Sequence, residues 1–127
     1  LLFSDDEKRK RLNEIVHPAV KQYILGEVEK ERQAGSYDYV IVEAALLIEE
    51  HYDELCDELW YVYASEETRK KRLMADRGYS EKKVDQIFAA QLPEVVYRQH
   101  CAVVIDNDRD MDHVLEQITR LYANEEK

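Results

Sequence analysis

The run Leu59-Trp60-Tyr61-Val62-Tyr63 is short, aromatic and β-branched, and the helix-capping residue Ser65 follows it closely. Two runs at residues 39–43 and 102–106 are similar, and each ends in a carboxylate. Runs of this kind predict buried strands. Stretches with helical spacing separate the three runs, so they predict helical crossovers and a parallel sheet of the α/β class.

Capping residues and apolar spacing predict helices around these strands. The capping-box pattern Ser4-Asp5-Asp6-Glu7 begins the first helix. Pro18 has no amide hydrogen, so we expect a break at His17 and a second helix from Pro18 to about Gly35. Further helices are predicted at about 44–54, at 65–77 between Ser65 and Gly78, at 80–91 after Ser80, and at about 110–123, with a turn at Pro93.

Composition and charge limit the classes of function. With 127 residues and 45% hydrophobic composition, the chain has the size and apolar content of one domain. Its formal net charge of −10 repels nucleic acids and anionic membrane surfaces. No apolar run approaches the roughly 20 residues of a membrane span. The isolated Cys56 and Cys101 predict neither a disulfide framework nor a zinc site, and no other metal site is indicated. We therefore expect a soluble, cytoplasmic protein that binds no nucleic acid.

Residues 69–83 carry seven Lys and Arg side chains against two acidic ones. Such a basic segment on an acidic protein suits a small polyanionic ligand, because repulsion from distant charges is screened. Arg72 and Arg77 have guanidinium groups that match phosphate oxygens. The alternative is a solvated helical face on which Arg72 pairs with Asp76, four residues later.

Other candidates lie where strands and helices end. In an open α/β sheet, ligands bind beyond the carboxyl ends of the strands, where Glu43 and the pair Asp106-Asn107 are found. Each of these residues can equally cap a turn. Gln91 suits either a helix-end hydrogen bond or a substrate contact. His17 suits either a cap of the broken helix or a base.

The order of these motifs resembles dephospho-CoA kinase, which transfers the ATP γ-phosphate to the ribose 3′-hydroxyl of dephospho-CoA to give coenzyme A. The resemblance rests on Leu12-Asn13-Glu14-Ile15-Val16-His17-Pro18, Val40-Ile41-Val42-Glu43-Ala44-Ala45-Leu46-Leu47-Ile48-Glu49, Arg72-Leu73-Met74, Arg77-Gly78-Tyr79-Ser80, Gln91 and Val104-Ile105-Asp106-Asn107. It implies a partial three-layer P-loop kinase fold in a single domain. Residues 1–36 would be its helical substrate-binding part, 37–64 and 101–127 its core, and 65–100 its lid and following helices.

The resemblance also implies site residues. The acceptor substrate would contact His17, Glu43, Leu46, Leu47 and Gln91. ATP would contact Arg72, Arg77, Asp106 and Asn107, with either Arg72 or Arg77 as the phosphate ligand. The substrates would thus be two small molecules, ATP and dephospho-CoA.

The phosphate-binding loop of such kinases, G-x-x-x-x-G-K-[ST], does not occur in the sequence. That loop supplies backbone amides, a lysine and a hydroxyl for Mg²⁺. In the family, the loop, its strand and the catalytic aspartate precede the segment that begins at Leu1. The resemblance therefore predicts the carboxyl-terminal part of a kinase, with the central first strand, the catalytic residues and the main magnesium ligands absent. We expect it to be inactive alone, and its exposed sheet edges would allow self-association.

Two alternative functions remain open at this point. One is another kinase of the nucleoside-monophosphate type, which would differ in its acceptor. The other is a non-catalytic acidic interaction module that reuses this architecture.

Overall fold

The computed structural model describes residues 6–125, so the predicted cap at Ser4 lies outside the described residues. The chain divides into two compact units, Leu1–Leu55 and Cys56–Lys127. The functional division into substrate-binding part, core and lid stays a prediction.

The first unit is built on one long helix, α1 (Asp6–Ala34), which contains Pro18. The predicted break at His17 was therefore wrong. Proline removes only one helical hydrogen bond, the one that would reach the carbonyl of Glu14, and Glu14 is exposed so that water can bond this carbonyl instead. The predicted end near Gly35 is confirmed, because Gly35 takes a positive φ of 62° just after the helix.

Residues 39–43 form no strand, which corrects the sequence-based expectation. A strand needs a neighbour for its backbone N–H and C=O groups, and no segment among residues 6–125 pairs with this one. Ile41 is consequently 83% exposed.

The helix expected at 44–54 is also wrong. Turns occupy residues 45–51, and a single 3₁₀ turn, η2 (Tyr52–Glu54), follows. Backbone hydrogen bonds there have mixed spacing, from His51 to Ile48 and from Tyr52 to Leu47. His51 has a left-handed φ of 58°, so a right-handed α-helix cannot continue through it to the buried Tyr52.

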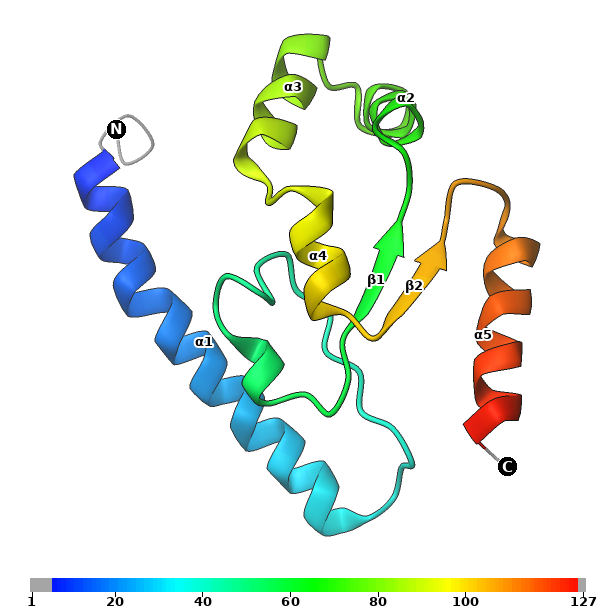
Figure 1. Cartoon of the computed structure of the whole chain (residues 1–127). Helices are drawn as coiled ribbons and strands as arrows, with labels where there is room; N and C mark the ends of the chain where they lie inside the picture. Colours follow the sequence, from blue (N-terminus) through cyan, green and yellow to red (C-terminus); the bar gives the residue numbers. More distant parts are fainter. Residues whose placement is uncertain (1–5, 126–127) are drawn as a thin grey trace. The chain divides into compact units, whose positions relative to one another are not determined.

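The second unit has the parallel strands β1 (Trp60–Tyr63) and β2 (Val103–Asp106), with Trp60 opposite Val103 and Tyr63 opposite Asp106. Three helices connect them: α2 (Glu66–Arg77), α3 (Glu81–Ala90) and α4 (Glu94–His100). Helix α5 (Met111–Glu125) follows β2 and packs on it (Figure 1). The predicted α/β class and the parallel pairing of these two strands are confirmed.

The helix boundaries of this unit follow the predicted capping residues. The hydroxyl of Ser65 accepts a hydrogen bond from the amide of Thr68, and that of Ser80 accepts one from the amide of Lys83, both at 3.2 Å. Gly78 ends α2 with a φ of 64°. These contacts satisfy backbone groups that helix ends leave without partners.

The core of the second unit is small. Its buried apolar residues are Leu59 and Ala64 at the two ends of β1, Val84 on α3 and Ile105 on β2. Leu59 and Ala64 therefore bury the two ends of β1, and Ile105 buries the middle of β2. Within residues 6–125, no helix is both long and apolar enough to cross a membrane.

Candidate functional site

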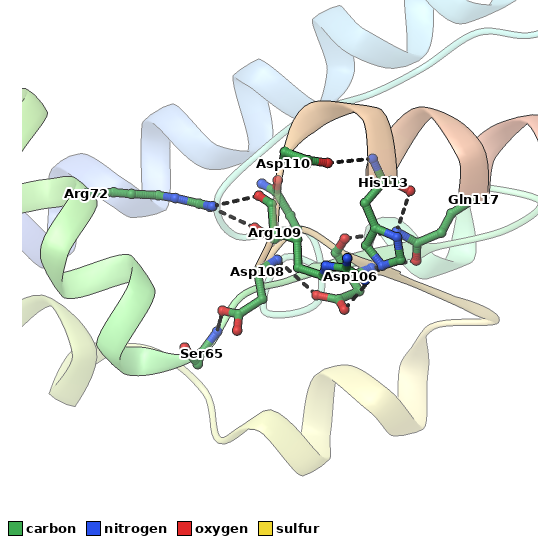
Figure 2. Close-up of polar contacts among 9 residues, drawn as sticks. Ser65, Arg72, Asp106, Asp108, Arg109, Asp110, His113 and Gln117 are labelled. Atoms are coloured by element: carbon green, nitrogen blue, oxygen red, sulfur yellow. Dashed lines mark hydrogen bonds and ion pairs between the residues drawn. The ribbon is translucent and has the colours of Figure 1, made fainter.

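The carboxyl ends of β1 and β2 meet at one edge of the sheet, because the strands are parallel. The amide of Asn107 donates to the carbonyl of Tyr63 at 2.7 Å, which extends the pairing beyond the strands. A carboxylate oxygen of Asp108 accepts from the amide of Ser65 at 2.8 Å (Figure 2). The loop after β2 is therefore fastened to the beginning of α2.

Arg72 reaches this loop from α2. Its guanidinium donates to the carbonyl of Asn107 at 2.8 Å and to that of Arg109 at 3.3 Å. In Figure 2 the side chain extends from its helix toward the loop that leads into α5. The structure thus brings Arg72 beside Asn107, and the alternative ion pair between Arg72 and Asp76 is not formed.

Asp106 is tied into the same loop. Its carboxylate accepts from the amide of Asp108 at 2.9 Å and lies 3.5 Å from Nε2 of His113. The Gln117 side chain accepts from the amide of Asp106 and donates to its carbonyl, both at 2.9 Å. Asp106 therefore shapes the loop, as the turn-capping alternative proposed.

The charge of Asp108 is favoured by its surroundings. The amide hydrogen bond from Ser65 holds the pKa of Asp108 below its ordinary value, and the side chains of Thr68 and Ser65 and the charge of Arg72 act in the same direction. Each of these groups stabilises the ionised carboxylate. The loop therefore carries a fixed negative charge next to the Arg72 guanidinium.

Arg77 differs from Arg72 in its environment. It lies in the last turn of α2, is exposed, and forms no hydrogen bond or ion pair with the residues that the structure describes. Its guanidinium is free to meet a ligand, whereas that of Arg72 is already bound to backbone carbonyls.

Gln91 belongs to a second cluster of this unit, at a cavity of about 420 Å³. The cavity is lined by the end of β1, the first turns of α2, and the segment from α3 to α4. The amide oxygen of Gln91 accepts from Nη1 of Arg69 at 2.9 Å. The ring of Tyr61, on one wall, stacks on that of Tyr97 with centroids 5.2 Å apart.

The remaining predicted residues lie in the first unit. Nδ1 of His17 lies 2.7 Å from Oε1 of Glu50, at an open groove. Nζ of Lys21 donates to the carbonyl of Glu50 at 2.9 Å. His17 therefore fastens the turn segment 45–51 to α1. Glu43 and Leu46 are exposed, and Leu47 is half-buried.

Seven of the nine predicted site residues thus form three groups: Arg72 with Asp106 and Asn107, Gln91 in the cavity, and His17 beside the turn segment that holds Leu46 and Leu47. Arg77 and Glu43 are exposed and belong to none of these groups. Three contributors were missed. Asp108 could have been suspected from the acidic run around it, and Arg69 from the basic segment. Nothing in the sequence marks Gln117 as the partner of a residue eleven positions earlier.

No metal centre is found in residues 6–125: none of their His, Cys, Asp and Glu side chains gather in groups of three or more that could hold an ion.

The parallel strand pair and the polar loop at its carboxyl edge define an α/β protein of the class that binds small ligands beyond its strand ends. The sequence profile of the dephospho-CoA kinase family matches residues 1–113. The chain belongs to the dephospho-CoA kinase family.

Curated relatives and a solved structure agree with this assignment. The chain is 35% identical over 93% of its length to the dephospho-CoA kinase of Shouchella clausii, covering 59% of it, and 34% identical over 97% to that of Geobacter sulfurreducens, covering 62%. The crystal structure of TT1252 from Thermus thermophilus matches with a TM-score of 0.78 and 28% identity, over 97% of this chain and 62% of that one. The chain spans about three-fifths of the length of these curated relatives.

Proposed function

We propose that the protein to which this chain belongs phosphorylates the ribose 3′-hydroxyl of dephospho-CoA with ATP, giving coenzyme A. The observation that carries this proposal is the family match over residues 1–113. The fastening of Arg72 to the loop after β2 supports it, because it joins a basic helix to the strand ends where such folds bind ligands.

On the ATP side, we assign Arg72, Arg77, Asp106 and Asn107. Arg77 has a free guanidinium at the end of α2, so it is the better candidate for a direct phosphate contact. Arg72 would hold the loop that contains Asp106 and Asn107 at a fixed distance from α2. Phosphoryl transfer depends mainly on positioning and on charge stabilisation. Arg72 would contribute to the positioning, and Arg77 would stabilise the phosphate charge.

On the acceptor side, we assign His17, Glu43, Leu46, Leu47 and Gln91. The half-buried Leu47 and exposed Leu46 offer apolar contact next to a charged turn, and Gln91 offers a hydrogen-bonding amide in the cavity. Dephospho-CoA combines apolar and polar parts, so each of these contacts suits one part of it.

The remaining machinery would be supplied from outside these 127 residues. We propose that the phosphate loop, the catalytic residues and the Mg²⁺ ligands lie elsewhere in the protein, since the sequence has no G-x-x-x-x-G-K-[ST] motif. The edge of β1 that is not paired with β2 would receive a further strand or mediate self-association. A cytoplasmic location fits the use of ATP.

The test begins with the whole reading frame that contains the codons of these residues. A phosphate loop encoded in frame before Leu1 supports the proposal, and a start codon without such a loop favours the non-catalytic module.

The protein of the whole reading frame is then assayed with ATP and one acceptor at a time, either dephospho-CoA or AMP, with the position of the new phosphate determined by NMR. The proposal requires a 3′-phosphate on dephospho-CoA. Phosphorylation of AMP alone would instead establish a nucleoside-monophosphate kinase.

A further inference from the structure

The side chain of Arg69 connects three parts of the second unit. Its Nε donates to the carbonyl of Ala64 at the end of β1, at 3.1 Å. Its Nη1 donates to Oε1 of Gln91 at 2.9 Å, and its guanidinium lies over the ring of Phe88, 4.4 Å from the centroid. Arg69 is therefore fixed in place by the strand end and by an aromatic face.

This arrangement determines the orientation of the Gln91 amide. A guanidinium has donors and no acceptor, so only the oxygen of Gln91 can face it. The Nε2 group is consequently left to donate elsewhere, and it bonds to no acceptor among residues 6–125. Because Gln91 lines the cavity of about 420 Å³, this donor is available to a ligand bound there.

The cavity wall indicates which chemistry the donor would meet. Tyr61, Tyr63 and Phe88 contribute aromatic surface, which suits a planar or sugar-like group. The carboxylates of Glu66 and Glu94 also line the cavity. The Glu94 carboxylate accepts a hydrogen bond from Arg98 at 2.8 Å. Its charge is therefore partly balanced, and the Gln91 amide together with Arg69 favours a ligand oxygen that accepts hydrogen bonds.

We propose that Arg69 is a positioning residue that orients Gln91 to donate from Nε2 to an oxygen of the acceptor substrate, dephospho-CoA. This inference rests on the proposed function, and it makes the cavity next to β1 part of the acceptor site. ATP, in contrast, is assigned to the loop after β2.

The variant Gln91→Glu separates this role from a structural one. Glutamate retains an oxygen for Arg69, so the contact within the protein remains and gains charge assistance. It has no N–H group, so the donor to the ligand is lost. In the protein of the whole reading frame we expect the KM for dephospho-CoA to rise about tenfold, the size expected of one lost hydrogen bond, with the KM for ATP unchanged.

Arg69→Met supplies the second arm, because methionine retains much of the length but has no donor. It frees the Gln91 amide to rotate, so the KM for dephospho-CoA should rise by several-fold. The double variant R69M/Q91E should be no worse than Q91E, because both changes remove the same interaction. Gln99→Glu, an equal charge change at an exposed position of α4, is the matched control and should match the wild type.

The outcomes are distinguishable. An unchanged KM for dephospho-CoA in Q91E, in an otherwise active wild-type enzyme, would overturn the role of Gln91 while the kinase assignment stands. Additive effects in the double variant would overturn the positioning role of Arg69. A wild-type protein that does not turn over dephospho-CoA would overturn the proposed function itself. Urea unfolding of each variant shows whether a loss of activity comes from a loss of folding.

Discussion

Arg72 and Arg77 lie on the same helix, yet their guanidinium groups have different surroundings. The guanidinium of Arg72 is bound to two carbonyls of the loop after β2, and that of Arg77 is exposed. A group already committed to backbone acceptors contributes to stability, because its removal leaves those acceptors without a partner. A free group at a helix end contributes only when a ligand arrives.

The first prediction contrasts the two arginines. Arg72→Met should lower the free energy of unfolding by about 1–2 kcal/mol, because two carbonyls lose their donor. Arg77→Met should leave stability within about 0.5 kcal/mol of the wild type, as is usual at exposed positions. In the protein of the whole reading frame, R77M should raise the KM for ATP about tenfold or more. Urea unfolding and steady-state kinetics measure these effects, and a KM for ATP unaffected by R77M would refute the phosphate assignment.

The second prediction concerns the pH dependence at Asp108. Its folded-state pKa is lowered, mainly by the amide of Ser65, so the ionised carboxylate stabilises the folded chain above about pH 4, the ordinary range of an aspartate. This stabilisation is lost as the pH falls through the lowered pKa. Asp108→Asn should therefore be less stable than the wild type near neutral pH, and the difference should disappear in acid. Urea titrations across this range check it, and a difference that does not depend on pH would contradict it.

The sequence indicated several of the site residues but not the residues that they contact. The positions of Arg72 and Asn107 were predictable, because strand ends and a basic helix converge in an α/β fold. The contact between Arg69 and Gln91 spans 22 positions and depends on how α3 returns to β1. Such pairings are set by tertiary packing, which residue spacing alone does not encode.

At the scale of the elements, capping chemistry was the most informative signal. Ser65 and Ser80 begin α2 and α3 where predicted, and Gly78 ends α2, since each one satisfies backbone groups locally. Three expectations failed where the outcome depends on more than neighbouring residues, and the helix expected at 44–54 is one of them. Pro18 stays inside α1, and residues 39–43 have no partner strand among residues 6–125.

The third prediction is a matched pair of glycine substitutions. Gly78 has a φ of 64°, a conformation in which a side chain is strained even though no atom lies within 4 Å of the added carbon. Gly78→Ala should therefore lower the free energy of unfolding by about 1 kcal/mol. Gly26, inside α1, has an ordinary φ and open space, so Gly26→Ala should stabilise by about 0.5–1 kcal/mol. Thermal or urea unfolding measures the change in stability of both variants. A stabilising effect of Gly78→Ala, with the same sign as that of Gly26→Ala, would contradict the left-handed conformation of Gly78.

At the scale of the whole molecule, the chain has two compact units and a sheet of two parallel strands. The α/β class and the family were predictable because ordered motifs extend over nearly the full sequence. The local structure of residues 39–54 was not predictable in this way, because it depends on the segments against which they pack.

We propose that these 127 residues carry binding elements of a kinase but not its phosphate cradle. The most direct measurement is the rate of ADP release in a coupled assay with ATP and dephospho-CoA, for the 127-residue chain alone and for the protein of the whole reading frame. We expect turnover by the longer protein and none by the chain alone. Turnover by the isolated chain, at a rate comparable to that of the longer protein, would contradict it.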